Sequence, residues 1–239
     1  MAEIEIAAPA GSLRGHLFLP SDGARAAGAA PYPGVVVVHD AIGMTADTLE
    51  SCQRIADEGY VVLAPDLYTR GGRARCVPRV LRDLLRHRGP AVDDLLAARE
   101  YLMEHDDCTG AVGIIGFCMG GGFAILMAPK GFDVSAPFYG VLPRHLTEVL
   151  EGSCPMVASF GRRDPMLIGA EKRLVRALQE NGVDYDVKTY PRAGHSFANK
   201  IDLGVATPLL RVTGFAYNEA ATEDAWRRVF TFLDEHLKV

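Results

Sequence analysis

Cys118 lies in a segment whose residue types favour nucleophilic catalysis. The segment is Gly116-Phe117-Cys118-Met119-Gly120, and it joins an apolar run to a helical pattern. The two glycines allow a strand and a helix to approach closely around a strained turn. The N-terminus of the helix would favour the thiolate, which is the reactive form of cysteine. The pattern predicts a nucleophile elbow, although a glycine-rich turn with an inert cysteine has the same sequence.

A thiol nucleophile needs a base to accept its proton and an acid to hold the base in the right tautomer. His195 and Asp164 each lie in a loop after a predicted strand, and the chain order is nucleophile, acid, histidine. That order is typical of α/β-hydrolases. We therefore predict that Cys118 is the nucleophile, His195 the base and Asp164 the residue that orients it. The alternative for Asp164 is an ordinary turn or capping aspartate.

An oxyanion formed at Cys118 would need two backbone N–H donors. The residue after the nucleophile, Met119, supplies one, and the loop after the third strand supplies the other, for which we choose Ala41. His39 lies just before this loop, where we expect a structural role, and the alternative is a residue that supports the site. We expect the other histidines outside the triad to be surface or packing residues: His16, His87, His105, His145 and His236.

Apolar runs that alternate with helical patterns must position these residues. Val35–Val38 is a continuous β-branched run, which is typical of a central strand buried on both faces. We predict strands at 4–6, 16–19, 35–38, 60–64, 112–116, 134–139, 156–160 and 185–190, the first two forming a hairpin. We predict helices at 46–58, 90–104, 121–127, 170–180 and 220–237, and from Pro78 within the basic segment 70–90.

This alternation predicts an α/β fold, with a mostly parallel twisted sheet and helices on both faces. We find no repeat and no linker, so we expect a single domain over residues 1–239. Residues 110–129 carry no charge, but their six glycines favour a buried strand, turn and helix over a membrane span.

The composition excludes several classes of protein. Apolar residues make up 49% of the chain and charged residues 23%, as in a folded globular protein. The net charge of −5 argues against nucleic acid or an anionic membrane as the main partner. The N-terminus has no signal-peptide pattern, and five scattered cysteines indicate reduced thiols, so we expect a cytoplasmic protein without a metal site.

With these motifs in place, the chain resembles the dienelactone hydrolase family of α/β-hydrolases. The matching segments lie between residues 38 and 197 and are Val38-His39-Asp40-Ala41-Ile42-Gly43, Gly59 to Tyr68, Gly116 to Gly121, Phe138-Tyr139-Gly140, Gly161 to Asp164 and Ala193 to Phe197. The resemblance implies a Cys-His-Asp triad that hydrolyses an ester or lactone without a metal or organic cofactor.

The resemblance also implies residues that support the site or bind the substrate. The family places an acidic residue, usually Glu, where this chain has Asp40, and that acid contacts the resting thiol. Tyr139 falls in a matching segment near the site. Family members that cleave dienelactone bind its carboxylate with arginines, one of them at the position of Asn199 and another before the elbow. This chain has seven arginines between Arg70 and Arg88, and a solvated helix face is the alternative for that cluster.

The sequence therefore favours a hydrolase that cleaves a small ester or lactone through an acyl-enzyme. The partner we expect is a small-molecule substrate, with no nucleic acid, membrane or cofactor, and we take a monomer as the default. The alternative is a non-catalytic or regulatory protein that retains the α/β-hydrolase fold. Carbon–halogen cleavage on a similar fold normally uses a carboxylate at the elbow, and Cys118 counts against it.

Overall fold

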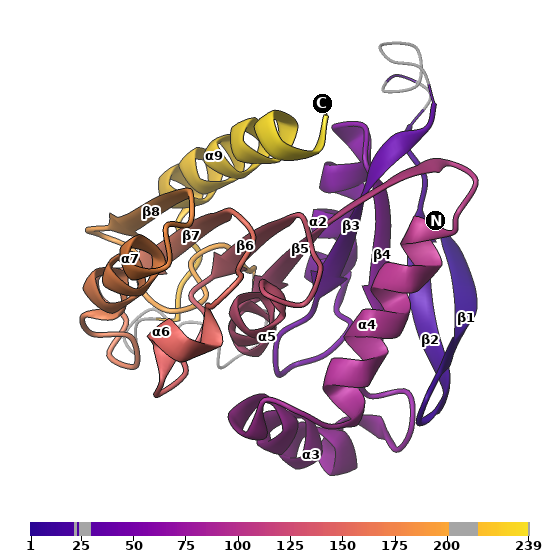
Figure 1. The fold of residues 1–239 in the computed structure, drawn as a ribbon, viewed down its shortest axis with the longest axis horizontal. Coiled ribbons are helices and arrows are strands. Elements are labelled where there is room, and N and C mark those ends of the chain that lie inside the picture. The colour runs from indigo at the N-terminus through magenta and orange to yellow at the C-terminus, as the bar shows by residue number, and fades with distance from the viewer. Residues whose placement is uncertain (22, 24–29, 201–214, 239) are drawn as a thin grey trace.

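The computed structural model describes residues 1–21, 23, 30–200 and 215–238 (Figure 1). Its strands are β1 (Ala2–Ala8), β2 (Gly11–Phe18), β3 (Tyr32–Val38), β4 (Val61–Pro65), β5 (Cys108–Phe117), β6 (Val134–Phe138), β7 (Met156–Gly161) and β8 (Tyr185–Tyr190). Its helices are α2 (Ala46–Asp57), α3 (Gly72–Arg86), α4 (Pro90–Met103), α5 (Met119–Met127), α6 (Leu146–Val149), α7 (Ala170–Glu180) and α9 (Glu219–Leu237).

The strands form one eight-stranded sheet in the order β1-β2-β4-β3-β5-β6-β7-β8. The β1–β2 hairpin is antiparallel, β2 pairs antiparallel with β4, and every pairing from β4 to β8 is parallel. The predicted hairpin and mostly parallel sheet are therefore confirmed. Because β3 lies in the middle of this order, the loop that follows it reaches the central part of the sheet's carboxyl edge.

The central strand β3 is buried along its whole length. Val35 and Val37 contribute to one hydrophobic cluster, whereas Val36 and Val38 contribute to the other. Alternate side chains of a strand point to opposite faces, so this β-branched run fills the core on both sides of the sheet.

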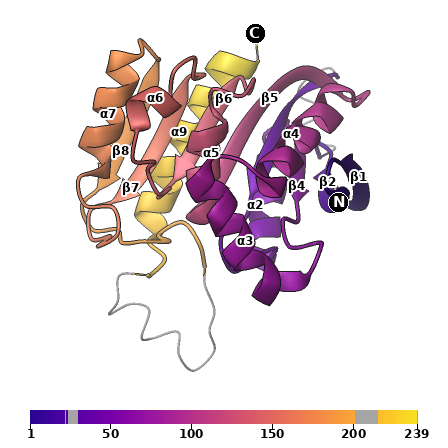
Figure 2. The same ribbon diagram turned by 60° about the horizontal axis from the view of Figure 1, so that its bottom comes forward.

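Helices cover both faces, as Figure 2 shows, with α2 and α9 on one side and α3, α4 and α5 on the other. The uncharged segment 110–129 forms most of β5, the elbow and α5. Across the described ranges, no helix combines the length and the apolar character that a bilayer span requires.

Two elements differ from the sequence prediction. Helix α3 begins at Gly72, so Pro78 lies inside the helix and does not start it. Its buried residues Cys76, Val80 and Leu84 recur at helical spacing, and their packing offsets the hydrogen bond that proline removes. The short helix α6 was not predicted, because four residues are too few to show a helical period.

Backbone contacts at the turn between β5 and α5 explain the glycines of the elbow. A Cβ atom at Gly116 would lie 2.0 Å from the carbonyl oxygen of Gly120, and one at Gly120 would lie 2.1 Å from the carbonyl oxygen of Val38. Both neighbours are backbone atoms, which cannot move away as a side chain can. The end of β3, the end of β5 and the start of α5 therefore meet in direct backbone contact.

Replacing Gly116 by alanine tests this packing. We expect Gly116→Ala to lower the free energy of unfolding by more than about 3 kcal/mol, because the added methyl group overlaps the backbone. The control is Gly152→Ala, at a position with φ 73° and no heavy atom within 4 Å of the added Cβ. That variant carries only the left-handed strain of about 1–2 kcal/mol. Urea denaturation measures both free energies of unfolding, and equal losses in Gly116→Ala and Gly152→Ala would contradict this packing.

Candidate active site

Cys118 occupies a strained turn between β5 and α5. Its backbone angles are φ 54° and ψ −111°, a conformation that a residue with a side chain rarely adopts. Its N–H donates to the carbonyl of Phe138 at 3.0 Å, which ties the turn to the end of β6. The residue is partly exposed and packs against one of the two hydrophobic clusters, at the carboxyl end of β5.

The structure brings together the three side chains expected to form the site. Nδ1 of His195 lies 2.6 Å from Oδ2 of Asp164, and Nε2 of His195 lies 3.1 Å from Sγ of Cys118. The other oxygen of Asp164 accepts the N–H of Met166 at 2.9 Å. A carboxylate only accepts hydrogen bonds, so Nδ1 of His195 carries a proton and Nε2 faces the sulfur.

Burial and hydrogen bonding act in opposite directions on His195. Burial disfavours the imidazolium, but the hydrogen bonds to Asp164 and Cys118 outweigh it and raise the pKa of His195 to about 9. The ring also packs near two aromatic rings, with Tyr139 at 5.2 Å and Phe215 at 5.1 Å between centroids. These contacts hold the imidazole between sulfur and carboxylate.

Tyr139 and Asn199 form a second buried layer behind His195. The hydroxyl of Tyr139 donates to Oδ1 of Asn199, and Nδ2 of Asn199 donates to Oδ2 of Asp47 at 2.7 Å. The backbone N–H of Lys200 donates to the other oxygen of Asp47 at 3.0 Å. Asp47 lies in the first turn of α2, so this helix anchors the loop that carries the histidine.

Asp40 and Ala41 lie in the loop after β3. Oδ1 of Asp40 accepts the N–H of Ile42 at 2.7 Å, and burial raises the pKa of this carboxyl. Within the described ranges, no hydrogen bond joins Asp40 to the thiol. The hydroxyl of Tyr68 donates to the carbonyl of Ala41 at 3.1 Å and lies 3.9 Å from Sδ of Met119, so the two residues expected to supply oxyanion donors share a neighbour.

Arginines of the 70–88 segment have different surroundings. Arg70 pairs with Asp94 and also donates to the carbonyls of Gly11 and Ser12, at the start of β2. Arg79 donates to Sγ of Cys76 at 3.3 Å, a contact between two residues of α3. Arg73 is exposed in the first turn of α3. Burial and the charge of Asp40 raise the pKa of Tyr68, whereas the charge of Arg73 lowers it.

A mostly apolar groove of about 500 Å³ lies beside α5. It is lined by Leu84, Leu85, Val141, Leu142 and Pro143, and also by His87, Arg144 and His145. A Cβ at Gly122 would be 3.0 Å from Cδ2 of Leu84 and 3.4 Å from the carbonyl oxygen of Val141. The groove wall therefore contacts α5 about one helical turn from Cys118. Among the described residues, no group of three His, Cys, Asp or Glu side chains is arranged to hold a metal ion.

Sequence reasoning did not identify Asp47 or Tyr68 as parts of the site. The local sequence indicates only an acid in a first helical turn at Asp47 and an aromatic residue after a strand at Tyr68. Their roles depend on partners 152 and 27 residues away along the chain, which no local pattern reveals.

Removing the thiol should lower the pKa of His195. Two of the interactions that raise it come from Cys118, so in Cys118→Ala the imidazole should lose its proton at a lower pH than in the unmodified protein. Titration of the His195 ring proton by NMR measures the change, and the exposed His145 is an internal reference. An unchanged pKa of His195 would show that the sulfur does not interact with the ring.

Comparison with known proteins places this site in a family. The model of the dienelactone hydrolase family matches residues 22–237. The carboxymethylenebutenolidase of Pseudomonas putida is 32% identical over 209 residues, covering 81% of this chain and 86% of that protein.

Solved structures show the same fold. A dienelactone hydrolase-like promiscuous phosphotriesterase from metagenomic libraries superposes with a TM-score of 0.80 at 23% identity, covering 99% of this chain and 98% of that one. An esterase from Pyrobaculum calidifontis gives a TM-score of 0.64 at 16% identity, with 97% and 84% covered. The architecture is thus the α/β-hydrolase fold, and the chain belongs to the dienelactone hydrolase family.

Proposed function

We propose that this protein hydrolyses a small ester or lactone through a thioester on Cys118. The observation that carries the proposal is the continuous contact from Asp164 to His195 at 2.6 Å and from His195 to Cys118 at 3.1 Å. The sulfur lies at the N-terminus of a helix in a strained turn, which is where a nucleophile elbow places its reactive atom. Family membership and the ester hydrolases among its relatives support the same reaction class.

In the first half-reaction, His195 holds the proton of Cys118 on Nε2, as the raised pKa of the ring favours, and the thiolate attacks the carbonyl carbon. A C–S bond forms while the carbonyl π pair moves to the oxygen, and the N–H groups of Met119 and Ala41 stabilise that oxyanion. The oxyanion then collapses and the carbon–oxygen bond of the alcohol breaks. His195 gives its proton to the departing alkoxide, which leaves a thioester. Asp164 stabilises the imidazolium throughout.

In the second half-reaction, His195 takes a proton from water and the hydroxide attacks the thioester. A second oxyanion forms at the same position, the C–S bond breaks, and the sulfur recovers its proton or remains as the thiolate. A thiolate is a much better leaving group than an amine, so the tetrahedral intermediate from an amide would return to substrate. Activated esters, enol-lactones and thioesters fit this site better than amides.

The surroundings of the sulfur also bear on the substrate. The position at which family members that cleave dienelactone carry an arginine is Asn199, whose amide is bound to Tyr139 and Asp47. We propose that Arg73 is the cation that faces a substrate carboxylate, because it is exposed in the first turn of α3, shortly after Tyr68, whose hydroxyl lies 3.9 Å from Sδ of Met119. The apolar groove beside α5 suits the uncharged part of the substrate.

Substitution of the three site residues tests the mechanism on p-nitrophenyl acetate and a small enol-lactone. We expect Cys118→Ala to lose at least ~10³-fold in kcat/KM, and His195→Ala and Asp164→Asn at least ~10²-fold, because each removes a group that acts in the transition state. The matched control is Cys154→Ala, at the other partly exposed cysteine of the structure. Turnover like that of the unmodified protein in Cys118→Ala would refute the mechanism.

A second pair of variants tests the substrate class. Arg73→Gln should lower kcat/KM at least about tenfold for a lactone that bears a carboxylate, since a lost charge-assisted hydrogen bond is worth about 1.5–3 kcal/mol. The same variant should leave p-nitrophenyl acetate hydrolysis unchanged, and Arg75→Gln, exposed on the same helix, is the control. Equal effects on both substrates would favour a neutral ester or lactone.

A further inference from the structure

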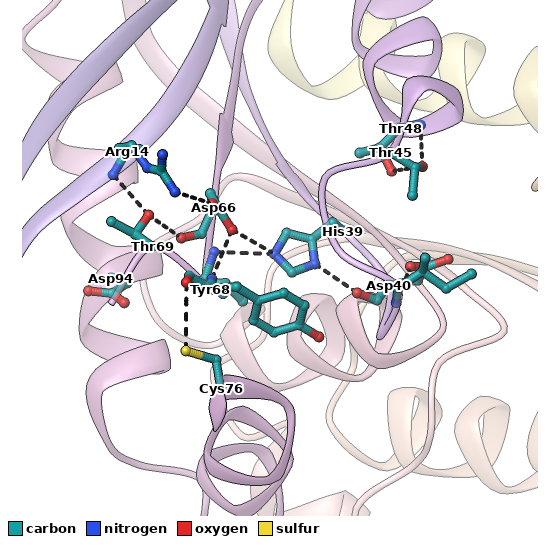
Figure 3. Close-up of polar contacts among 12 residues, drawn as sticks. Arg14, His39, Asp40, Thr45, Thr48, Asp66, Tyr68, Thr69, Cys76 and Asp94 are labelled. Carbon is teal, nitrogen blue, oxygen red and sulfur yellow. Dashed lines mark hydrogen bonds and ion pairs between the residues drawn. The ribbon is translucent and has the colours of Figure 1, made fainter. Parts of the chain in front are cut away.

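His39 is a fully buried polar residue that the mechanism above does not use. It directly follows the central strand β3, and its side chain has no exposed surface. Figure 3 shows its imidazole between the segment Asp66–Tyr68, after β4, and Asp40, after β3. Its ring also meets the ring of Tyr68 edge-on, at 4.7 Å between centroids and 64° between planes.

The contacts of the ring fix its tautomer. The N–H of Leu67 donates to Nε2 of His39 at 3.2 Å, so Nε2 is an acceptor and carries no proton. The proton of the neutral ring is therefore on Nδ1, which donates to the carbonyl oxygen of Asp40 at 2.7 Å. Burial lowers the pKa of His39, against the smaller opposing effects of Asp66 and Asp40, and this keeps the ring neutral.

Leu67 is held where it can make this contact. The N–H of Asp66 donates to the carbonyl of Arg14 at 2.8 Å, which ties the loop after β4 to β2. Oδ1 of Asp66 accepts the N–H of Tyr68 at 2.9 Å and closes a tight turn around Leu67. One of the two hydrogen bonds that orient His39 thus comes from the loop after β4, which contributes no residue of the Cys-His-Asp set.

The hydrogen bond to Asp40 has a consequence for the next residue. The carbonyl of Asp40 belongs to the same planar peptide as the N–H of Ala41, and in a trans peptide the two groups point in opposite directions. Nδ1 of His39 and the N–H of Gly43, at 3.2 Å, both hold that carbonyl. Rotation of this peptide would break both hydrogen bonds, so the direction of the Ala41 N–H is fixed.

That N–H is free to receive an oxyanion. In the described part of the chain, no hydrogen bond uses the N–H of Ala41. The N–H of Met119, in the first position of α5, has no intrahelical acceptor either. The backbone of Gly120 abuts the carbonyls of Val38 and His39, and the Tyr68 hydroxyl contacts both Ala41 and Met119.

We infer that His39 is a positioning residue for the oxyanion site, because its Nδ1–H holds the 40–41 peptide in the orientation that presents the Ala41 N–H. This inference rests on the proposed function. It assigns to His39 a role in the reaction, through Ala41, beyond filling space in the core.

Two substitutions separate the two hydrogen bonds of the ring. Asparagine places its amide nitrogen where His39 has Nδ1, so His39→Asn keeps a donor for the Asp40 carbonyl and loses the acceptor for Leu67. Glutamine places its terminal amide where His39 has Nε2, so His39→Gln keeps the acceptor and loses the donor. A packing role predicts similar losses in both variants, whereas a positioning role predicts a large difference.

The experiment measures kcat and KM for p-nitrophenyl acetate and, separately, the rate at which iodoacetamide alkylates Cys118. Alkylation at a saturated carbon forms no oxyanion, so it reports on the Cys118–His195 pair alone. We expect His39→Gln to lower kcat about 10²-fold with KM within about threefold, the loss typical of one oxyanion donor. The alkylation rate of His39→Gln should equal that of the unmodified protein. His39→Asn should keep kcat within about tenfold of the unmodified value.

Equal losses of kcat in the two variants, or a parallel fall in the alkylation rate, would overturn the inference. Full turnover in Cys118→Ala would instead refute the proposed function. This test needs no His39 variant, so the two failures can be told apart. If His39→Gln does not fold, 1,1,1-trifluoroacetone bound to the unmodified protein supplies a second measurement. Its hemithioketal on Cys118 should shift the amide protons of Ala41 and Met119 downfield in NMR, and no shift at Ala41 would also overturn the inference.

Discussion

The backbone contact between Gly120 and the end of β3 determines where every other part of the site lies. A side chain at position 120 would lie 2.1 Å from the carbonyl oxygen of Val38, so only glycine allows α5 to start at this point. The contact places the N-terminus of α5 beside the loop that carries Ala41. The sulfur of Cys118 and two backbone N–H groups are therefore gathered by the packing of three elements, before any polar side chain contributes.

Polar side chains around the site, buried like Asp164 or partly buried like Asp47, are held by hydrogen bonds. Asp164 accepts from His195 and Met166, and Asp47 accepts from Asn199 and Lys200. Such pairing limits the free-energy cost of burying carboxylates. It also fixes the orientation of the imidazole, so the site is organised in the absence of substrate.

The sequence was most informative where the chemistry and the chain order constrain each other. The G-x-C-x-G segment, the later aspartate and the histidine loop identified the three side chains that meet. Hydrophobic runs likewise predicted every strand of the sheet and the helices α2, α4, α7 and α9, although β2 and β5 begin five and four residues before their predicted starts. Both signals are local, because an elbow is a short turn and a buried strand is a short run.

The remaining features depend on contacts between distant residues. Helix α3 extends past Pro78 because its apolar face is buried, and no propensity argument supplies that information. The partners of His39 are the backbone groups of Leu67 and Asp40, which carry no side-chain signature. The place of Asn199 in a network with Tyr139 and Asp47 likewise appears only when the loops are assembled.

A covalent intermediate on Cys118 is the most direct measure of the reaction. Rapid mixing with p-nitrophenyl acetate, quenching in acid and mass spectrometry of the digested protein locate the acetyl group. An acetyl thioester on the peptide that contains Cys118, formed with a burst of p-nitrophenol, is the predicted result. Nucleophilic catalysis by this thiol would be contradicted by steady turnover with Cys118 unmodified at every quench time. It would also be contradicted by an acetyl group on another residue that forms and decays fast enough to account for turnover.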